Sequence, residues 1–290
     1  MTKKLFTMAV AILFFSFGAN AQLLWKISGN GLGKPSYLFG THHLIEKEQI
    51  KNFDKALDLC KASDMMIGEV DLSDIAAMQT ALMQGSVMQG TTCKDLMSVE
   101  DYALVDNEFK QVIGVGLEQL GVMKPMMLNT LYSVTVYLKS NNITKQPQAV
   151  DMVFQKTAKE NNKKVMGLET TQDQIDALFN ALPLKRQAEI LVKSVKEKEK
   201  GIQLLKNLNE IYLAGDLKKA EKLFNDDDSM TPEERKPILD NRNNNWMKAL
   251  PALMKEGQCF VAVGLGHLVG EVGLIHQLQK AGYKVEAVEM

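Results

Sequence analysis

The chain has 290 residues, and its 34 lysines and arginines nearly balance its 35 aspartates and glutamates, for a formal net charge of −1. No basic patch reaches the density that nucleic acid binding requires, so we expect no nucleic acid partner. Three cysteines, Cys60, Cys93 and Cys259, are too few for a disulfide-based fold. Their apolar neighbours are typical of buried thiols, although an oxidising compartment would permit one bridge between Cys60 and Cys93.

The first 21 residues have the features of a secretory signal peptide. Lys3 and Lys4 precede an apolar run over 5–17, and Gly-Ala-Asn-Ala at 18–21 supplies the small residues that a signal peptidase reads. The run is shorter than the about 20 residues of a membrane span, and an uncleaved anchor is the alternative. We therefore expect a signal peptide over 1–21 and a mature protein that is periplasmic or secreted, with no stable membrane anchor after cleavage.

Four segments then share one design, in which a short apolar run is followed by a glycine and a histidine or glutamate. These segments are 36–43, 64–69, 164–169 and 260–267. Such runs are typical of buried strands in a mostly parallel sheet. A glycine at the end of a strand permits a sharp turn or the close approach of another group. Because ligands bind beyond the carboxyl ends of such strands, we expect the polar residues to converge on one site.

The segments between these strands are predicted to be helical. An apolar stripe marks 50–61, and a strand–helix–strand unit closes the chain, with its helix over about 270–280. Two longer stretches, 74–137 and 185–256, are predicted to be helical insertions that cover the sheet and wall the crevice. The sequence thus predicts an α/β fold, with a central mostly parallel sheet, flanking helices and two helical insertions, as one domain over 22–290.

Two of the four histidines, His43 and His267, end Gly-x-x-His turns that follow apolar runs. Two imidazoles with a carboxylate suit Zn²⁺, Mn²⁺, Co²⁺ or Fe²⁺. An ion with an open position would polarise a carbonyl and lower the pKa of a bound water. His42 competes with His43 for this role, because neighbouring residues of a strand point to opposite faces. Alternatively, the histidines satisfy backbone groups at the strand ends.

Two glutamates, Glu69 and Glu169, follow matching strand–glycine patterns. A carboxylate at such an edge is a metal ligand, a general base or a helix cap. The pattern alone does not choose among these roles.

In chain order, these motifs resemble those of the TraB/GumN family, which includes the Tiki proteins. The resemblance extends from about residue 24 to the C-terminus. Its motifs are Tyr37-Leu38-Phe39-Gly40-Thr41-x-His43, Glu69, Gly167-Leu168-Glu169-Thr170, Arg242-Asn243-x-x-Trp246 and Gly264-x-Gly266-His267-Leu268-x-Gly270-x-x-Gly273.

The resemblance implies a metal-dependent hydrolase, since Tiki proteins are described as metalloproteases that favour Mn²⁺ or Co²⁺. By position, His43 and His267 would be metal ligands, and Glu69 and Glu169 would be ligands or the base. Arg242 would orient a glutamate or stabilise negative charge on the substrate, unless it is an ordinary arginine on a helix surface. An aspartate common in the family aligns with Asp151, which could instead only cap a helix.

The sequence departs from the family at His42, where a hydrophobic residue is more usual, and it lacks the C-terminal membrane anchor of animal Tiki proteins. The leading prediction is an exported metal-dependent hydrolase, a metalloprotease acting on peptide or related amide bonds of a peptide or protein substrate. The alternatives are a non-catalytic periplasmic protein that binds a metal or haem, and one that sequesters a secreted peptide.

Overall fold

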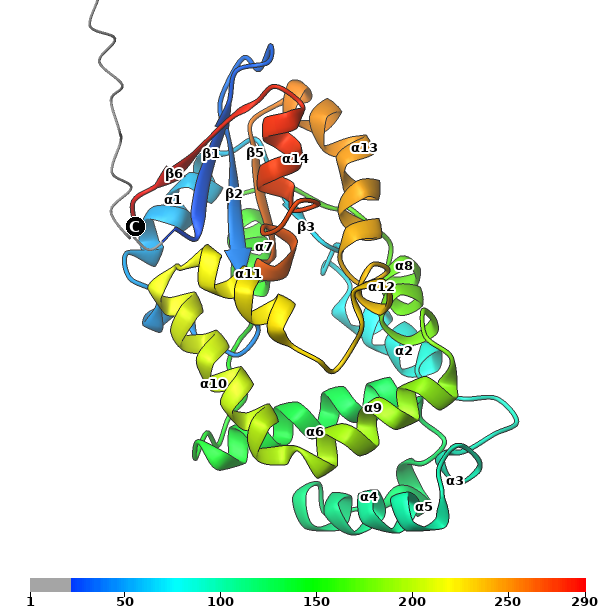
Figure 1. The fold of residues 1–290 in the computed structure, drawn as a ribbon. Coiled ribbons are helices and arrows are strands. Elements are labelled where there is room, and N and C mark those ends of the chain that lie inside the picture. Colours follow the sequence, from blue (N-terminus) through cyan, green and yellow to red (C-terminus); the bar gives the residue numbers. More distant parts are fainter. Residues whose placement is uncertain (1–21) are drawn as a thin grey trace, which may run out of the picture.

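The computed structural model describes residues 22–290 (Figure 1). The predicted signal peptide lies outside these residues. A six-stranded sheet has the order β4-β3-β5-β2-β1-β6. Its strands are β1 (Leu24–Ser28), β2 (Ser36–Thr41), β3 (Met65–Gly68), β4 (Lys164–Gly167), β5 (Cys259–Gly264) and β6 (Lys284–Val288).

Four of the predicted strands, β2 to β5, are neighbours in the sheet and run parallel, which confirms the predicted α/β class. The predicted last strand is β6. The register places Thr41 beside Gly264, and Gly68 beside Gly167. The residues that follow these strands therefore leave the sheet at one edge. Strand β1, which the sequence analysis did not identify, pairs antiparallel with both β2 and β6.

Helices cover both faces of the sheet. On one face lie α1 (Phe53–Ala62) and α7 (Val150–Glu160), and Phe39, Phe154 and Phe260 form the aromatic centre of the core there. The other face is covered by α13 (Asp240–Glu256) and α14 (Leu274–Lys280). Burial of these apolar side chains supplies the main driving force that fixes the helices on the sheet.

A second layer of helices lies at the bottom of Figure 1, away from the sheet. Its core contains Val105, Phe109, Leu128 and Leu191, and no strand residue belongs to that cluster. The prediction that the first insertion covers the sheet is therefore wrong, because its apolar side chains pack against one another and against α9. The helices of this layer are α3 (Cys93–Leu96), α4 (Val99–Val112), α5 (Leu117–Leu120), α6 (Pro125–Ser140) and α9 (Leu184–Lys196).

The second predicted insertion is divided between the two layers. The second predicted insertion contributes α9 to the helical layer, whereas its last helix, α13, covers the sheet. Within this insertion the sequence Thr231-Pro232-Glu233-Glu234 predicts a capped helix start, and the structure confirms it, since the Thr231 hydroxyl accepts from the amide of Glu234. The remaining helices are η1 (Lys47–Gln49), α2 (Ile75–Gly85), α8 (Thr171–Ile175), the π-helix η2 (Asp176–Asn180), α10 (Lys198–Ala214), α11 (Leu217–Asp226), α12 (Pro232–Arg235) and η3 (Leu265–His267).

The three cysteines are free and buried. Cys60 lies in the sheet core and Cys93 in the core of the helical layer, so they do not form a bridge. Burial raises the pKa of both thiols to about 12, which keeps them unreactive at neutral pH.

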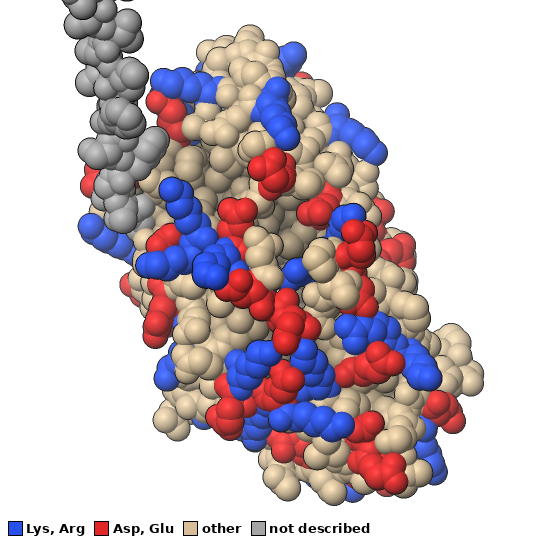
Figure 2. Space-filling view, viewed as in Figure 1, with Lys and Arg blue, Asp and Glu red and all other residues tan. Residues whose placement is uncertain are grey.

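The face shown in Figure 2 carries lysines and arginines interspersed with aspartates and glutamates, without a region of one sign. Within 22–290, none of the helices combines the length and the apolar character that crossing a membrane requires.

Candidate functional site

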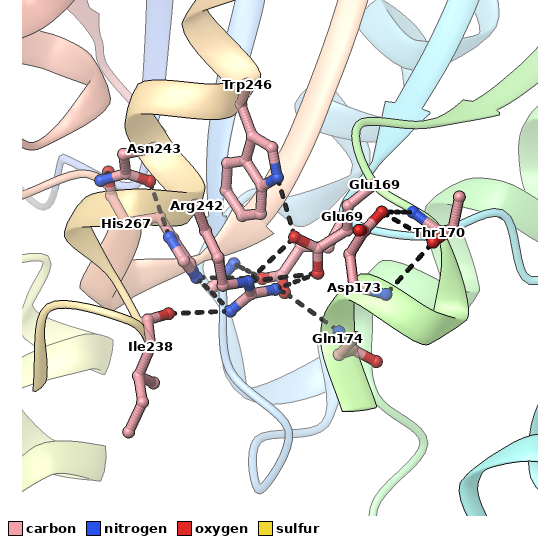
Figure 3. A network of polar contacts seen from close by, with 11 residues as sticks. Glu69, Glu169, Thr170, Asp173, Gln174, Ile238, Arg242, Asn243, Trp246 and His267 are labelled. Atoms are coloured by element: carbon pink, nitrogen blue, oxygen red, sulfur yellow. Dashed lines mark hydrogen bonds and ion pairs between the residues drawn. The ribbon is translucent and has the colours of Figure 1, made fainter. Parts of the chain in front are cut away.

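Four predicted site residues from distant parts of the chain meet at the carboxyl edge of the parallel strands (Figure 3). Glu69 follows β3 and Glu169 follows the end of β4, while His267 closes the short helix η3 after β5. Arg242 reaches them from the first turn of α13. The register of the sheet explains why three of these side chains share one edge.

The guanidinium of Arg242 is the centre of the group, and its side chain is only 8% exposed. Nε lies 3.0 and 3.1 Å from the two Glu169 oxygens, and Nη2 lies 2.6 Å from both Glu169 Oε1 and Glu69 Oε2. Nη1 contacts the carbonyl of Ile238 at 3.1 Å and Nε2 of His267 at 2.9 Å. These contacts use all five N–H donors of the guanidinium. Arg242 is therefore not an ordinary surface arginine, and it keeps no donor for a substrate.

His267 is held between two partners. Because arginine can only donate, Nε2 of His267 accepts the hydrogen bond from Arg242 and the ring proton is assigned to Nδ1. Nδ1 then donates to Asn243 Oδ1 at 2.7 Å, and the amide nitrogen of Asn243 donates to the carbonyls of His267 and Val272. Burial lowers the pKa of His267 to about 4, so the ring is neutral at pH 7.

Glu69 is the more accessible of the two carboxylates, with a side chain 19% exposed against 5% for Glu169. Its Oε1 accepts from the amide of Gly264 at 2.7 Å. Burial acts to raise the pKa of Glu69, but His267, Arg242 and this amide outweigh it and hold the pKa at about 2. Glu69 is therefore ionised at neutral pH and a weak proton acceptor.

Glu169 is held by two side chains of α13. In addition to Arg242, the indole Nε1 of Trp246 donates to Glu169 Oε2 at 3.0 Å. The Arg242 guanidinium carbon also lies 4.9 Å from the centroid of the Trp246 ring, a cation–π distance. The helix thus fixes this carboxylate from two sides.

The glycines at the strand ends allow neighbouring atoms to approach the backbone closely, and they do not form turns that need a positive φ. None of Gly40, Gly68, Gly167 and Gly264 has a positive φ. A Cβ at Gly264 would lie 3.2 Å from Glu69 Oε1, and one at Gly167 would lie 2.8 Å from the backbone of Asp71 and of Glu169. Glycine at these positions lets the carboxylate-bearing loops pack directly on the strand ends.

His43 lies outside the Arg242 network. Its side chain is 67% exposed, and its Nδ1 lies 3.8 Å from Asp151 Oδ1. Asp151 does not cap its helix, because Ala149 occupies the N-cap position. The structure therefore brings together His267, Glu69, Glu169 and Arg242, and leaves His43 with Asp151.

His42 is the buried member of the histidine pair. Its Nδ1 accepts from the amide of Leu44 at 3.0 Å, and its ring packs edge-on against Tyr212. Burial and the neighbouring His43 lower the pKa of His42 to about 4. Both His42 Nε2 and Asp151 Oδ1 are buried without a hydrogen-bond partner among residues 22–290.

Sequence reasoning assigned no role to three groups that complete the site, namely Asn243, Trp246 and the amide of Gly264. The spacing Arg242-Asn243-x-x-Trp246 held a signal for the first two. Residues three or four apart share a helix face, so Trp246 is expected on the same side of the helix as Arg242 and Asn243. The role of a backbone amide had no signal in the sequence.

As arranged, the side chains of the network do not fit a divalent cation. The Nε2 lone pair of His267 is taken by Arg242, and both glutamates are paired with the same guanidinium. Across the described part of the chain, no three His, Cys, Asp or Glu side chains form a group that could hold a metal ion. The expected metal ligation by His43 and His267 remains a prediction.

Residues 23–287 match the model of the TraB/PrgY/gumN family. No curated protein and no solved structure matches the chain. Since the match spans nearly the whole described region, the chain belongs to the TraB/PrgY/gumN family.

Proposed function

We propose that the chain is an exported hydrolase of peptide or related amide bonds that acts at the carboxyl edge of its parallel strands. The observation that carries this proposal is the convergence of Glu69, Glu169, Arg242 and His267 in one buried network. Burying this many charged groups costs desolvation energy, and such networks add little to stability by themselves. Groups with strongly shifted pKa values at a strand edge are typical of functional sites.

The cofactor in this proposal is a divalent metal ion, with Mn²⁺ or Co²⁺ favoured by the family resemblance and Zn²⁺ or Fe²⁺ as alternatives. Arg242 donates to the His267 Nε2 lone pair and to Glu69 Oε2, two atoms that such an ion would need. Within the chain, Glu69 is an ionised carboxylate on the open side of the network and Arg242 fixes both glutamates. His267 Nε2 has no free lone pair while Arg242 donates to it, whereas Glu69 keeps unused acceptor capacity on its carboxylate oxygens.

The substrate in this proposal is a peptide or protein outside the cytoplasm, in the periplasm or beyond the cell. The signal-peptide features of 1–21 support that location, and the near-neutral charge supports a partner other than nucleic acid.

Hydrolysis of a peptide library by residues 22–290, with added Mn²⁺ or Co²⁺ and with a chelator, tests the proposal. Glu69→Gln is expected to reduce the rate at least about 100-fold, because the charged carboxylate on the open side is lost. Glu271→Gln is the matched control, since its side chain is 83% exposed and pairs only with surface groups. An inactive wild type with every metal, or an active Glu69→Gln variant, would contradict the proposal.

A non-catalytic binding protein is the second candidate. It is favoured by one observation, that the donors of Arg242 and both ring nitrogens of His267 are fully used within the chain. Stoichiometric binding of a metal, haem or peptide without turnover, measured on the same preparation, would select it.

A further inference from the structure

We propose that Gln174 and Glu69 form a subsite for the backbone of an extended peptide. In this subsite the Glu69 carboxylate accepts from the N–H of one peptide residue, and the Gln174 amide donates to the C=O of the same residue. The inference rests on the proposed peptide substrate and adds how the chain holds it. Because only backbone groups of the peptide are contacted, the subsite requires an extended chain and no particular side chain.

The other donors of the network are already used within the chain. Arg242 uses all five of its N–H groups. The indole N–H of Trp246 donates to Glu169, and the amide nitrogen of Asn243 donates to two backbone carbonyls. The ring N–H of His267 is taken by the oxygen of Asn243. None of these groups keeps a donor for a bound molecule.

Gln174 differs from these side chains because its carboxamide is nearly unused. Its side chain makes one contact among residues 22–290, from Nε2 to Glu69 Oε2 at 3.5 Å. This distance is at the long limit of a hydrogen bond, so the contact is weak. Figure 3 shows the amide nitrogen turned toward the network. Since Nε2 carries two N–H groups, at least one of them remains for another molecule.

The backbone of Gln174 is fixed beside the network. Helix α8 begins soon after Glu169, and its first turn is closed by a capping box in which Thr170 and Asp173 exchange hydrogen bonds. The next residue, Ile175, is 2% exposed and packs in a hydrophobic cluster. The partly buried side chain of Gln174 is therefore held next to Glu69, the more accessible of the two glutamates.

Glu69 supplies the acceptor that the Gln174 amide lacks. Its oxygens accept from the amide of Gly264 and from Arg242, and a carboxylate has room for further donors. In an extended chain the N–H and C=O of one residue point to the same side, as in the hydrogen-bonded pairs of antiparallel strands. Because Nε2 and Oε2 lie only 3.5 Å apart, one extended residue can meet the donor and the acceptor together.

Charge favours the interior of a peptide over its carboxyl terminus. Among the described residues, Arg242 is the only lysine or arginine that forms an ion pair with Glu69 or Glu169. Two glutamates and one arginine leave a formal charge of −1, since the imidazole of His267 is neutral. A terminal carboxylate would face this charge without a free cation, whereas an uncharged peptide group meets no repulsion.

Peptide binding tests the inference, with an array of short uncharged peptides of mixed sequence, blocked at both ends, as the probe. EDTA in the buffer prevents metal-dependent cleavage during the measurement. Gln174→Met is expected to weaken binding about 10-fold across the sequences, because one hydrogen bond to the backbone is lost. In the peptide that the wild type binds most tightly, N-methylation at one internal position is expected to weaken binding by at least about 10-fold, because Glu69 loses its donor.

Gln172→Met is the matched control, because Gln172 lies on the same helix but is exposed and donates to Asp176 at 3.0 Å. It is expected to bind the array as the wild type does. A wild type that binds none of the peptides, a folded Gln174→Met that binds them equally well, or N-methylation without effect at every position would overturn the inference. If Gln174→Met does not fold, the N-methylated series on the wild type decides. Binding that depends on Gln174 without any hydrolysis would support the subsite and contradict only the proposed catalysis.

Discussion

Arg242 determines the state of every polar side chain around it. It pairs with both Glu69 and Glu169 and fixes His267 as the neutral Nδ1–H tautomer. Two roles were predicted for Arg242, orienting a glutamate and stabilising negative charge on a substrate. Because all five donors of its guanidinium are used within the chain, only the orientation of the glutamates fits this arrangement. This distinction depends on counting donors, which a sequence motif cannot supply.

At the same scale, Trp246→Phe is expected to destabilise the protein by about 1–3 kcal/mol, because Glu169 loses a charge-assisted hydrogen bond while the ring packing is kept. Urea unfolding followed by circular dichroism measures the change. The only other tryptophan supplies the control, since Trp25 Nε1 donates to the neutral carbonyl of Gln22. Trp25→Phe is expected to cost about 0.5 kcal/mol. Equal losses would show that the Glu169 bond adds nothing.

At the scale of elements, the site depends on how closely loops pack against strand ends. The loop after β3 is fixed by Gln155 of α7, which donates to the carbonyl of Val70 and accepts from the amide of Leu72. Glu69 is therefore held by its neighbours in the chain as well as by Arg242. Gly167 provides the space in which this loop meets the end of β4.

Two glycine substitutions separate the effect of close packing from the effect of backbone freedom on stability. Gly167→Ala is expected to cost about 1–3 kcal/mol, because its Cβ would lie 2.8 Å from backbone atoms that cannot rotate away. Gly201→Ala in α10 is expected to gain about 0.5–1 kcal/mol, since no atom lies within 4 Å and alanine favours the helix. Thermal unfolding of the two variants measures both effects. A tolerated Gly167→Ala would refute the close-packing explanation.

At the scale of the whole molecule, two histidines link stability to pH. Burial, the main cause for both, lowers the pKa of His42 and His267 from 6.5 to about 4 in the folded state. Between these values the unfolded chain binds more protons than the folded one, so stability falls as pH falls. Glu69, with its pKa held at about 2, extends the loss below pH 4.5.

We expect the free energy of unfolding to fall between pH 6.5 and pH 4 by up to about 1.4 kcal/mol per pH unit for each of the two histidines. Urea unfolding across this range measures the slope. His42→Asn keeps an acceptor for the amide of Leu44 and should lower the slope by up to about 1.4 kcal/mol per pH unit, the contribution of one proton. Trp25→Phe, which removes no titratable group, is the control and should leave the slope unchanged. A flat profile from pH 7 to 5 would contradict the shifts.

The sequence by itself determined the strands that carry the site and the edge where they end. Continuous apolar runs predict buried parallel strands, and the residues after them must leave the sheet together, which placed Glu69, Glu169 and His267 correctly. The same local patterns predicted the helical stretches, including the capped start at Thr231. They missed β1, whose short run Leu24–Ser28 is interrupted by Lys26 and is not a continuous apolar segment.

Only the tertiary structure decided what these residues contact. It left His43 beside Asp151 and outside the Arg242 network, although His43 and His267 end the same motif, and it placed the guanidinium of Arg242 against His267 and both glutamates. It also gave the first helical insertion its own core rather than a place on the sheet. Hydrophobic patterns specify which face of an element is buried, whereas its partner is chosen by packing and charge pairing across the whole chain.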